Sequence, residues 1–253
     1  MAAVRPLLFG LCRWAAAYVA VLPSFPTNAR FGGYSSEHRG GHLTFRSGER
    51  FPSVAVRGGF TLELDTVRCL SRSWATQFYY GRVRQFEEDK WSLHLGRAQP
   101  SKPVEIEVIK GGRPGDFLWT GLSLCVCREK VLTLLGQEGF TGYATYPVTV
   151  ERKGKLLPDY GGLAVLGRAG FLDDERSRAE RFVREDGSFG GYTAIDGLYF
   201  EPTTWDGSDI FCLQDVPGQI LLTEKVWKSM QAAQITNFKA RPLREFGFGH
   251  RRA

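Results

Sequence analysis

Residues 129–148 read EKVLTLLGQEGFTGYATYPV, and residues 224–243 read EKVWKSMQAAQITNFKARPL. The two stretches align without a gap at an offset of 95 residues. The identical positions are Glu129, Lys130, Val131, Thr141 and Pro147, which recur as Glu224, Lys225, Val226, Thr236 and Pro242. Because an internal repeat sets the architecture of a chain, we expect the two stretches to fold alike.

The similarity extends upstream of each stretch. Asp116 precedes the apolar segments FLWT and LSLCVC, and Asp209 precedes Ile210-Phe211 and then QILLT, with two extra residues in the second copy. Short apolar runs bounded by turn residues are typical of strands. We therefore predict an α+β fold with two repeated strand-strand-helix-strand units, around residues 116–150 and 209–246, on a mixed or antiparallel sheet. A pseudo-twofold axis is one way to relate the units.

The helix of each unit has a recognisable beginning and end. Glu129 and Glu224 place a carboxylate at the N-terminus, where the helix dipole is positive. Gly142 and Asn237 occupy equivalent positions after the helices, and both residue types tolerate a positive φ. The second helix has an apolar stripe that would pack on a sheet: Val226, Trp227, Met230 and Ala233.

The chain divides into three parts. Residues 1–25 form a non-core N-terminal extension, a weak signal-like segment or a product of a misplaced start. Residues 26–160 are an N-terminal α+β half with the first repeat, and residues 161–253 are a C-terminal half with the second repeat and a basic tail. Arg13 interrupts the best apolar run, which is then shorter than the ~20 residues that cross a bilayer, so we expect no membrane span.

Two further regions have a weaker pattern. The charged stretch FLDDERSRAERFVREDG, residues 171–187, predicts a surface helix whose Phe182 and Val183 contact the body of the protein. Residues 26–110 contain alternating segments, so we expect strands and loops that pair with the first repeat.

Composition limits the class of protein. A chain of 253 residues with 43% hydrophobic and 24% charged residues is not wholly disordered. The content of 30 Gly and 18 Phe favours turn-rich β or α+β structure over a helical bundle.

The cysteines are predicted to be reduced core thiols. They are odd in number in a chain too long to need disulfides. Cys125 and Cys127 alternate within an apolar run, so a strand would turn both to the same side. The five positions are Cys12, Cys69, Cys125, Cys127 and Cys212.

Chemistry-bearing motifs are sparse. His38 and His42 have a spacing that binds zinc on a helix, but the glycines between them indicate a loop. The adjacent Asp173 and Asp174 are typical of the cap of the charged helix predicted after them. We predict no catalytic, cofactor-binding or metal-binding residue and no cofactor.

The two repeats, FLWTGLSLCVCREKVLTLLGQEGFTG and SDIFCLQDVPGQILLTEKVWKSMQAAQITNFKARPL, together with FPSVAVRGG at residues 51–59, resemble a family of bacterial immunity proteins. These are the myxobacterial double-CxxCG-motif immunity proteins of contact-exchanged toxin systems. The similarity covers much of residues 45–246, and its most specific part is Asp-Ile-Phe followed by Thr-Glu-Lys-Val in the second copy.

The resemblance implies a cytoplasmic protein that binds and neutralises a cognate protein toxin. In that family two CxxCG pairs would assemble a four-thiolate zinc site. This chain reads HRGGHLTFRSGER before Phe51 and has no cysteine from Leu156 to Ile210, so neither pair carries over. The net charge of +6 favours an acidic partner surface or binding driven by shape.

Two alternative functions stay open. An enzyme of an unrecognised class would bring some of Asp173, Asp174, His94 and Cys125 together in a pocket. A regulatory interaction module would use the basic tail on nucleic acid, although no aromatic side chains interleave with its basic residues as in nucleic-acid motifs. The residues of that tail are Arg241, Arg244, His250, Arg251 and Arg252.

Overall fold

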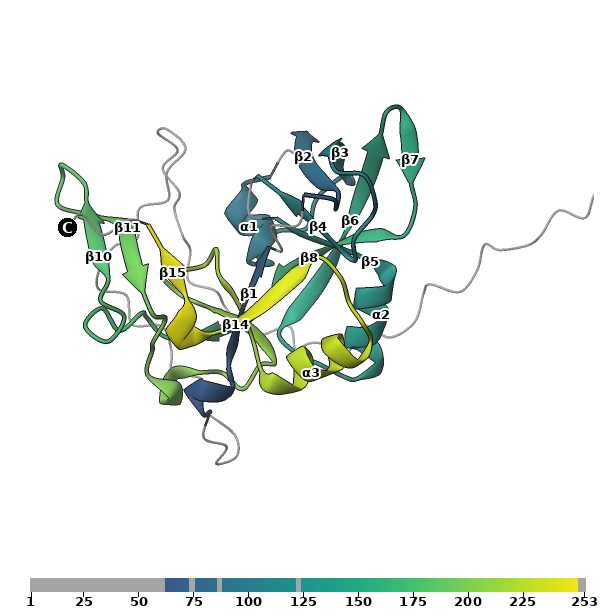
Figure 1. Cartoon of the computed structure of the whole chain (residues 1–253). Helices are drawn as coiled ribbons and strands as arrows, with labels where there is room; N and C mark the ends of the chain where they lie inside the picture. The colour runs from purple at the N-terminus through teal and green to yellow at the C-terminus, as the bar shows by residue number, and fades with distance from the viewer. Residues whose placement is uncertain (1–61, 73–75, 86–87, 122–123, 250–253) are drawn as a thin grey trace, which may run out of the picture. The chain divides into compact units, whose positions relative to one another are not determined.

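The computed structural model describes residues 62–72, 76–85, 88–121 and 124–249 (Figure 1). All the described residues belong to one compact unit. This unit mixes helix and sheet and consists mostly of strands, as the α+β prediction expects. No helix within the described residues has the length and apolar character needed to span a bilayer.

Six strands close into a barrel. The order around it is β3-β2-β4-β5-β8-β6, and parallel pairing of β3 with β6 closes the ring, while β7 extends β6 at one edge. The pairings β2–β4 and β3–β6 are parallel and the others antiparallel, so the sheet is mixed. The strands are β2 (Tyr80–Gln85), β3 (Val104–Lys110), β4 (Phe117–Thr120), β5 (Cys125–Arg128), β6 (Tyr143–Arg152), β7 (Lys155–Leu157) and β8 (Tyr160–Val165).

An apolar core in the barrel unites side chains from its strands with Leu93 of the short helix α1 (Lys90–His94). The ring of Tyr146 lies directly against Gly162, where a Cβ atom would stand only 2.0 Å from the ring. A glycine at this point therefore leaves room for the aromatic side chain.

A second, five-stranded sheet has the order β14-β1-β13-β12-β9. It is antiparallel except for the pairing of β9 with β12. Its strands are β1 (Arg68–Arg72), β9 (Gly167–Ala169), β12 (Ile210–Leu213), β13 (Ile220–Leu222) and β14 (Phe238–Pro242). Short 3-10 turns are η1 (Leu64–Thr66), η2 (Pro202–Thr204) and η3 (Leu243–Glu245).

The helices α2 (Glu129–Gln137) and α3 (Glu224–Ala232) contact each other, as Figure 1 shows. Both begin at the predicted glutamates. Gly142 has φ +87° and Asn237 has φ +64°, so the predicted positive φ is confirmed at both positions. An apolar core beneath the helices combines residues of β5 and β8 with residues of β1, β12 and β13. The predicted N-terminal and C-terminal halves thus share a core.

Reciprocal hydrogen bonds join segments 116–150 and 209–246. Asp116 accepts hydrogen bonds from the backbone N and the Oγ1 of Thr236, both at 2.8 Å. Asp209 accepts from the backbone N of Thr141 at 3.1 Å and from its Oγ1 at 3.0 Å. In return, each aspartate N donates to the threonine Oγ1. Each segment therefore holds the turn after the helix of the other.

The prediction of a surface helix over residues 171–187 is wrong. Asp173 instead accepts a hydrogen bond from the backbone N of Arg176 in a turn, and β10 (Glu180–Val183) follows. β10 pairs with β11 (Phe189–Asp196), which also pairs with β15 (Gly247–Phe248). Cross-strand pairing with Phe189 and Gly191 prevails here over the helix-forming tendency of the charged residues.

The four described cysteines are buried and free of disulfide bonds, as predicted. Cys125 and Cys127 lie on β5 and face the same core, whereas Val126 faces the barrel interior. Burial raises the pKa of the Cys69 and Cys125 thiols to about 12, so both stay protonated at neutral pH. Cys12 lies outside the described residues.

Candidate functional site

The hairpin of β10 and β11, at the left of Figure 1, exposes large apolar side chains. Phe182 is 51% exposed and Val183 is 55% exposed, although the sequence predicted that both contact the body. Exposed apolar groups on one protruding element are typical of protein-binding surfaces. We call Glu180–Asp196 the aromatic hairpin.

Tyr192 anchors the aromatic hairpin to the body of the protein. Its hydroxyl lies 2.6 Å from Asp215 Oδ2 and 3.0 Å from Asp174 Oδ1, and it donates to this carboxylate pair. Asp215 also accepts from the backbone N of Leu172 at 3.0 Å. Burial, and then the hydrogen bond to Asp215, raises the pKa of the Tyr192 hydroxyl, which keeps it a donor at physiological pH.

Arg181 links the hairpin to the same carboxylates. It forms an ion pair with Asp174, which raises the pKa of the guanidinium. Its guanidinium carbon lies 5.6 Å from the centre of the Phe189 ring, and Phe189 packs edge-on against Tyr192 at a centroid distance of 5.0 Å. These contacts restrict the side chains on one face of the hairpin before any partner binds.

Phe182 also has a defined position. A Cβ atom on Gly190 would stand 2.4 Å from Phe182 Cδ1, so the ring lies against the bare backbone of the neighbouring strand. Its ordering therefore costs little additional conformational entropy on association. Phe182 thus supplies an ordered apolar anchor of the kind found in binding hot spots, while Arg181 is engaged with Asp174.

The residues that an enzyme would need have separate partners. Asp173 caps a turn, and Asp174 binds Tyr192 and Arg181. His94 is buried, its Nε2 lies 2.8 Å from the carbonyl oxygen of Pro217, and burial lowers its pKa. Cys125 lies in the core beneath α2 and α3.

Metal ligands are not grouped in the part of the chain that the structure describes, where no three His, Cys, Asp or Glu side chains gather at a candidate site. Arg241 and Arg244 of the basic tail are described, and Arg244 lies 3.8 Å from Asp65. The remaining candidates, His38, His42, His250, Arg251 and Arg252, fall outside the described residues.

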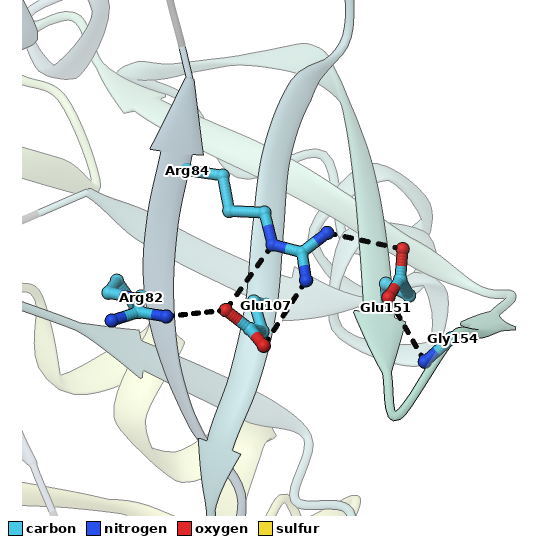
Figure 2. A network of polar contacts seen from close by, with 5 residues as sticks. All are labelled: Arg82, Arg84, Glu107, Glu151 and Gly154. Carbon is cyan, nitrogen blue, oxygen red and sulfur yellow. Dashed lines mark hydrogen bonds and ion pairs between the residues drawn. The ribbon is translucent and has the colours of Figure 1, made fainter.

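A network of charges covers one side of the barrel (Figure 2). Arg82 and Arg84 on β2 contact Glu107 on β3 at 2.7 Å and 3.2 Å, and Arg84 also contacts Glu151 on β6 at 3.4 Å. Glu151 accepts from the backbone N of Gly154 at 3.0 Å. All these charges are solvent-accessible and paired, so the network joins three strands of the barrel.

We expect Glu107 to give the barrel an acid-dependent stability. Hydrogen bonds from Arg84 and then Arg82 lower the pKa of its carboxyl from 4.5 to about 2. A carboxyl with a lowered folded-state pKa stabilises the fold above its unfolded pKa, and this contribution disappears as the pH falls from about 4.5 to about 2. Urea midpoints should therefore drop less over this window for Glu107→Gln than for the parent protein.

The control for Glu107 is Glu138→Gln, at the end of α2 and outside the network. Glu138 is exposed, so this variant removes the same charge from a solvent-facing position. Its urea midpoint should follow the parent protein across the window. Equal pH profiles for both variants would contradict a specific contribution from the Glu107 network.

No model of a known protein family matches the chain, and no curated protein matches it either. The aromatic hairpin had a signal in the sequence: an apolar pair, Phe182-Val183, stands close to Gly187 and to the glycine pair at residues 190–191. Turn-forming glycines between apolar residues predict a hairpin.

Proposed function

We propose that this protein is immunity-like: it binds a cognate bacterial toxin in the cytoplasm and neutralises it through protein–protein interaction. The observation that carries the proposal is the exposure of Phe182 and Val183 on a hairpin that Tyr192 and Arg181 hold in place. A preorganised apolar anchor lowers the entropic cost of association, which favours tight binding.

We also propose that segments 116–150 and 209–246 are repeat units related by an approximate twofold axis. The reciprocal pairs Asp116–Thr236 and Asp209–Thr141 support this relation, because Thr141 and Thr236 are equivalent in the alignment. The left-handed residues Gly142 and Asn237 follow them at equivalent positions. In this proposal the repeats supply the scaffold, and the aromatic hairpin, which lies between them in the sequence, supplies the contact.

The first test is affinity purification of the tagged full-length chain from the bacterium that encodes it, with mass spectrometry of the bound proteins. The leading partner is then expressed alone and together with this chain. A partner that is toxic alone and harmless on co-expression would support the proposal. Failure to recover a specific partner, with no relief of toxicity, would remove it.

We expect the double variant Phe182→Ser, Val183→Ser to bind the recovered toxin roughly 30-fold more weakly, because loss of a hot-spot anchor costs about 2 kcal/mol or more. Titration calorimetry measures the loss. Leu156→Ser is the matched control, because Leu156 is 63% exposed on β7, outside the hairpin. Equal affinities for the two variants would place the contact elsewhere. Thermal unfolding of both variants separates lost binding from lost folding.

A further inference from the structure

The strand β14 is an edge strand among the described residues. It pairs there with β1 alone, at the end of the five-stranded sheet, and its other side is free of described strands. Lys239 turns its carbonyl oxygen toward β1, where it accepts from Ser71 Oγ at 3.5 Å. Because backbone groups alternate along a strand, those of Ala240 point to the open side. Pro242 lies two residues after Ala240, so its backbone also faces the open side. A proline, which has no N–H to donate, is tolerated at such a position on an edge strand.

A groove runs along this free side, between β14 and α3. It is an open, shallow hollow of about 510 Å³. Its apolar lining comes from Trp227 on α3, from Ile235 in the following turn and from Phe238 on β14. Lys239 and Arg241 line it as well, and alternation along the strand places them on the face opposite Phe238. The groove therefore offers an apolar side and a basic side.

The positive charges of the groove have no acidic partner within the described residues. Neither Lys239 nor Arg241 forms an ion pair with a carboxylate there, and the guanidinium carbon of Arg68 lies 4.8 Å from the centre of the Trp227 ring. Glu224, on the same helix as Trp227, is paired with Lys228 at 3.3 Å. A ligand that supplies carboxylates would thus complement this surface.

We propose that β14 and α3 form a binding site for an extended acidic segment of a partner protein. The segment adds to the sheet as a strand beside β14 and hydrogen-bonds to the backbone of Ala240. Its apolar side chains lie against Trp227 and Phe238, and its alternate carboxylates reach Lys239 and Arg241. Strand addition of this kind obtains affinity from main-chain hydrogen bonds and selectivity from alternate side chains. The site is separate from the aromatic hairpin.

The experiment selects random nine-residue peptides, displayed as a library, on the immobilised full-length protein. We expect enrichment of sequences in which acidic and apolar residues alternate. An enriched peptide, labelled with fluorescein, should bind at least tenfold more weakly to Arg241→Glu and to Lys239→Glu by fluorescence anisotropy. Lys155→Glu, which makes the same charge change at an exposed position on β7, should bind like the parent protein.

N-methylation of alternate peptide amides tests the backbone pairing. The methylated peptide should lose binding, because a methylated amide donates no hydrogen bond to an edge strand. If the methylated peptide bound as tightly as the unmethylated one, the interaction would depend on charge and not on backbone hydrogen bonds, which would contradict strand addition. The proposed site would be contradicted if no peptides with alternating acidic and apolar residues were enriched. It would also be contradicted if an enriched peptide bound the parent protein and the β14 variants equally. The selection uses no toxin, so its outcome is independent of the proposed neutralising function.

Discussion

Replacement of Asp116 with alanine is expected to lower the free energy of unfolding by about 2 kcal/mol, because it removes a buried carboxylate that accepts two hydrogen bonds. Asp116 is 6% exposed, and its carboxylate accepts both the backbone N–H and the hydroxyl of Thr236. Urea unfolding followed by tryptophan fluorescence measures the loss.

Asp209→Ala is the matched variant in the second segment. The Asp209 carboxylate makes the same two contacts with Thr141 and a third with the Thr223 hydroxyl at 3.2 Å. However, Asp209 is only partly buried and its hydrogen bonds with Thr141 are exposed to water, so we expect a loss of about 1 kcal/mol. A larger loss for Asp209→Ala than for Asp116→Ala would mean that burial does not control the strength of these pairs.

Local features of the fold could be predicted from the sequence. The beginnings of α2 and α3 follow from Glu129 and Glu224, and the left-handed turns follow from Gly142 and Asn237. Each of these depends on the intrinsic preferences of a few neighbouring residues, so a short window contains the necessary information.

Long-range pairing could not be predicted in this way. β1, at residues 68–72, lies between β13 and β14, which are about 150 and 170 residues further along the chain. The barrel closes only because residues 104–107 pair in parallel with residues 148–151. No turn joins these strands directly, and their apolar alternation would fit several neighbours, so the sequence pattern does not select the partner.

The candidate site was the least predictable part. The charged residues near Phe182 favour a helix locally, and the prediction of a surface helix over residues 171–187 rested on that preference. The hairpin forms because strand β11 offers Phe189 and Gly191 as cross-strand neighbours, and because Tyr192 reaches Asp215. Asp215 stands 23 positions after Tyr192, with no motif that would link the two side chains in advance.

Gly142→Ala is expected to be strongly destabilising, with a loss of about 4 kcal/mol in unfolding free energy from backbone strain and overlap. Gly142 has φ +87°, which L side chains rarely adopt. A Cβ atom there would also stand 2.1 Å from the carbonyl oxygen of Ile210. Since that oxygen belongs to the backbone of β12, no side-chain rotation can relieve the overlap.

Gly139→Ala separates strain from overlap. Gly139 has φ +67° in the same turn region, yet nothing lies within 4 Å of its Cβ position. Its loss should therefore be only about 1 kcal/mol, the cost of a left-handed alanine. The difference between the two variants, measured by urea unfolding, reports the close approach of the turn after α2 to β12. Equal losses would show that the backbone at Ile210 moves freely and that the two segments are not tightly joined there.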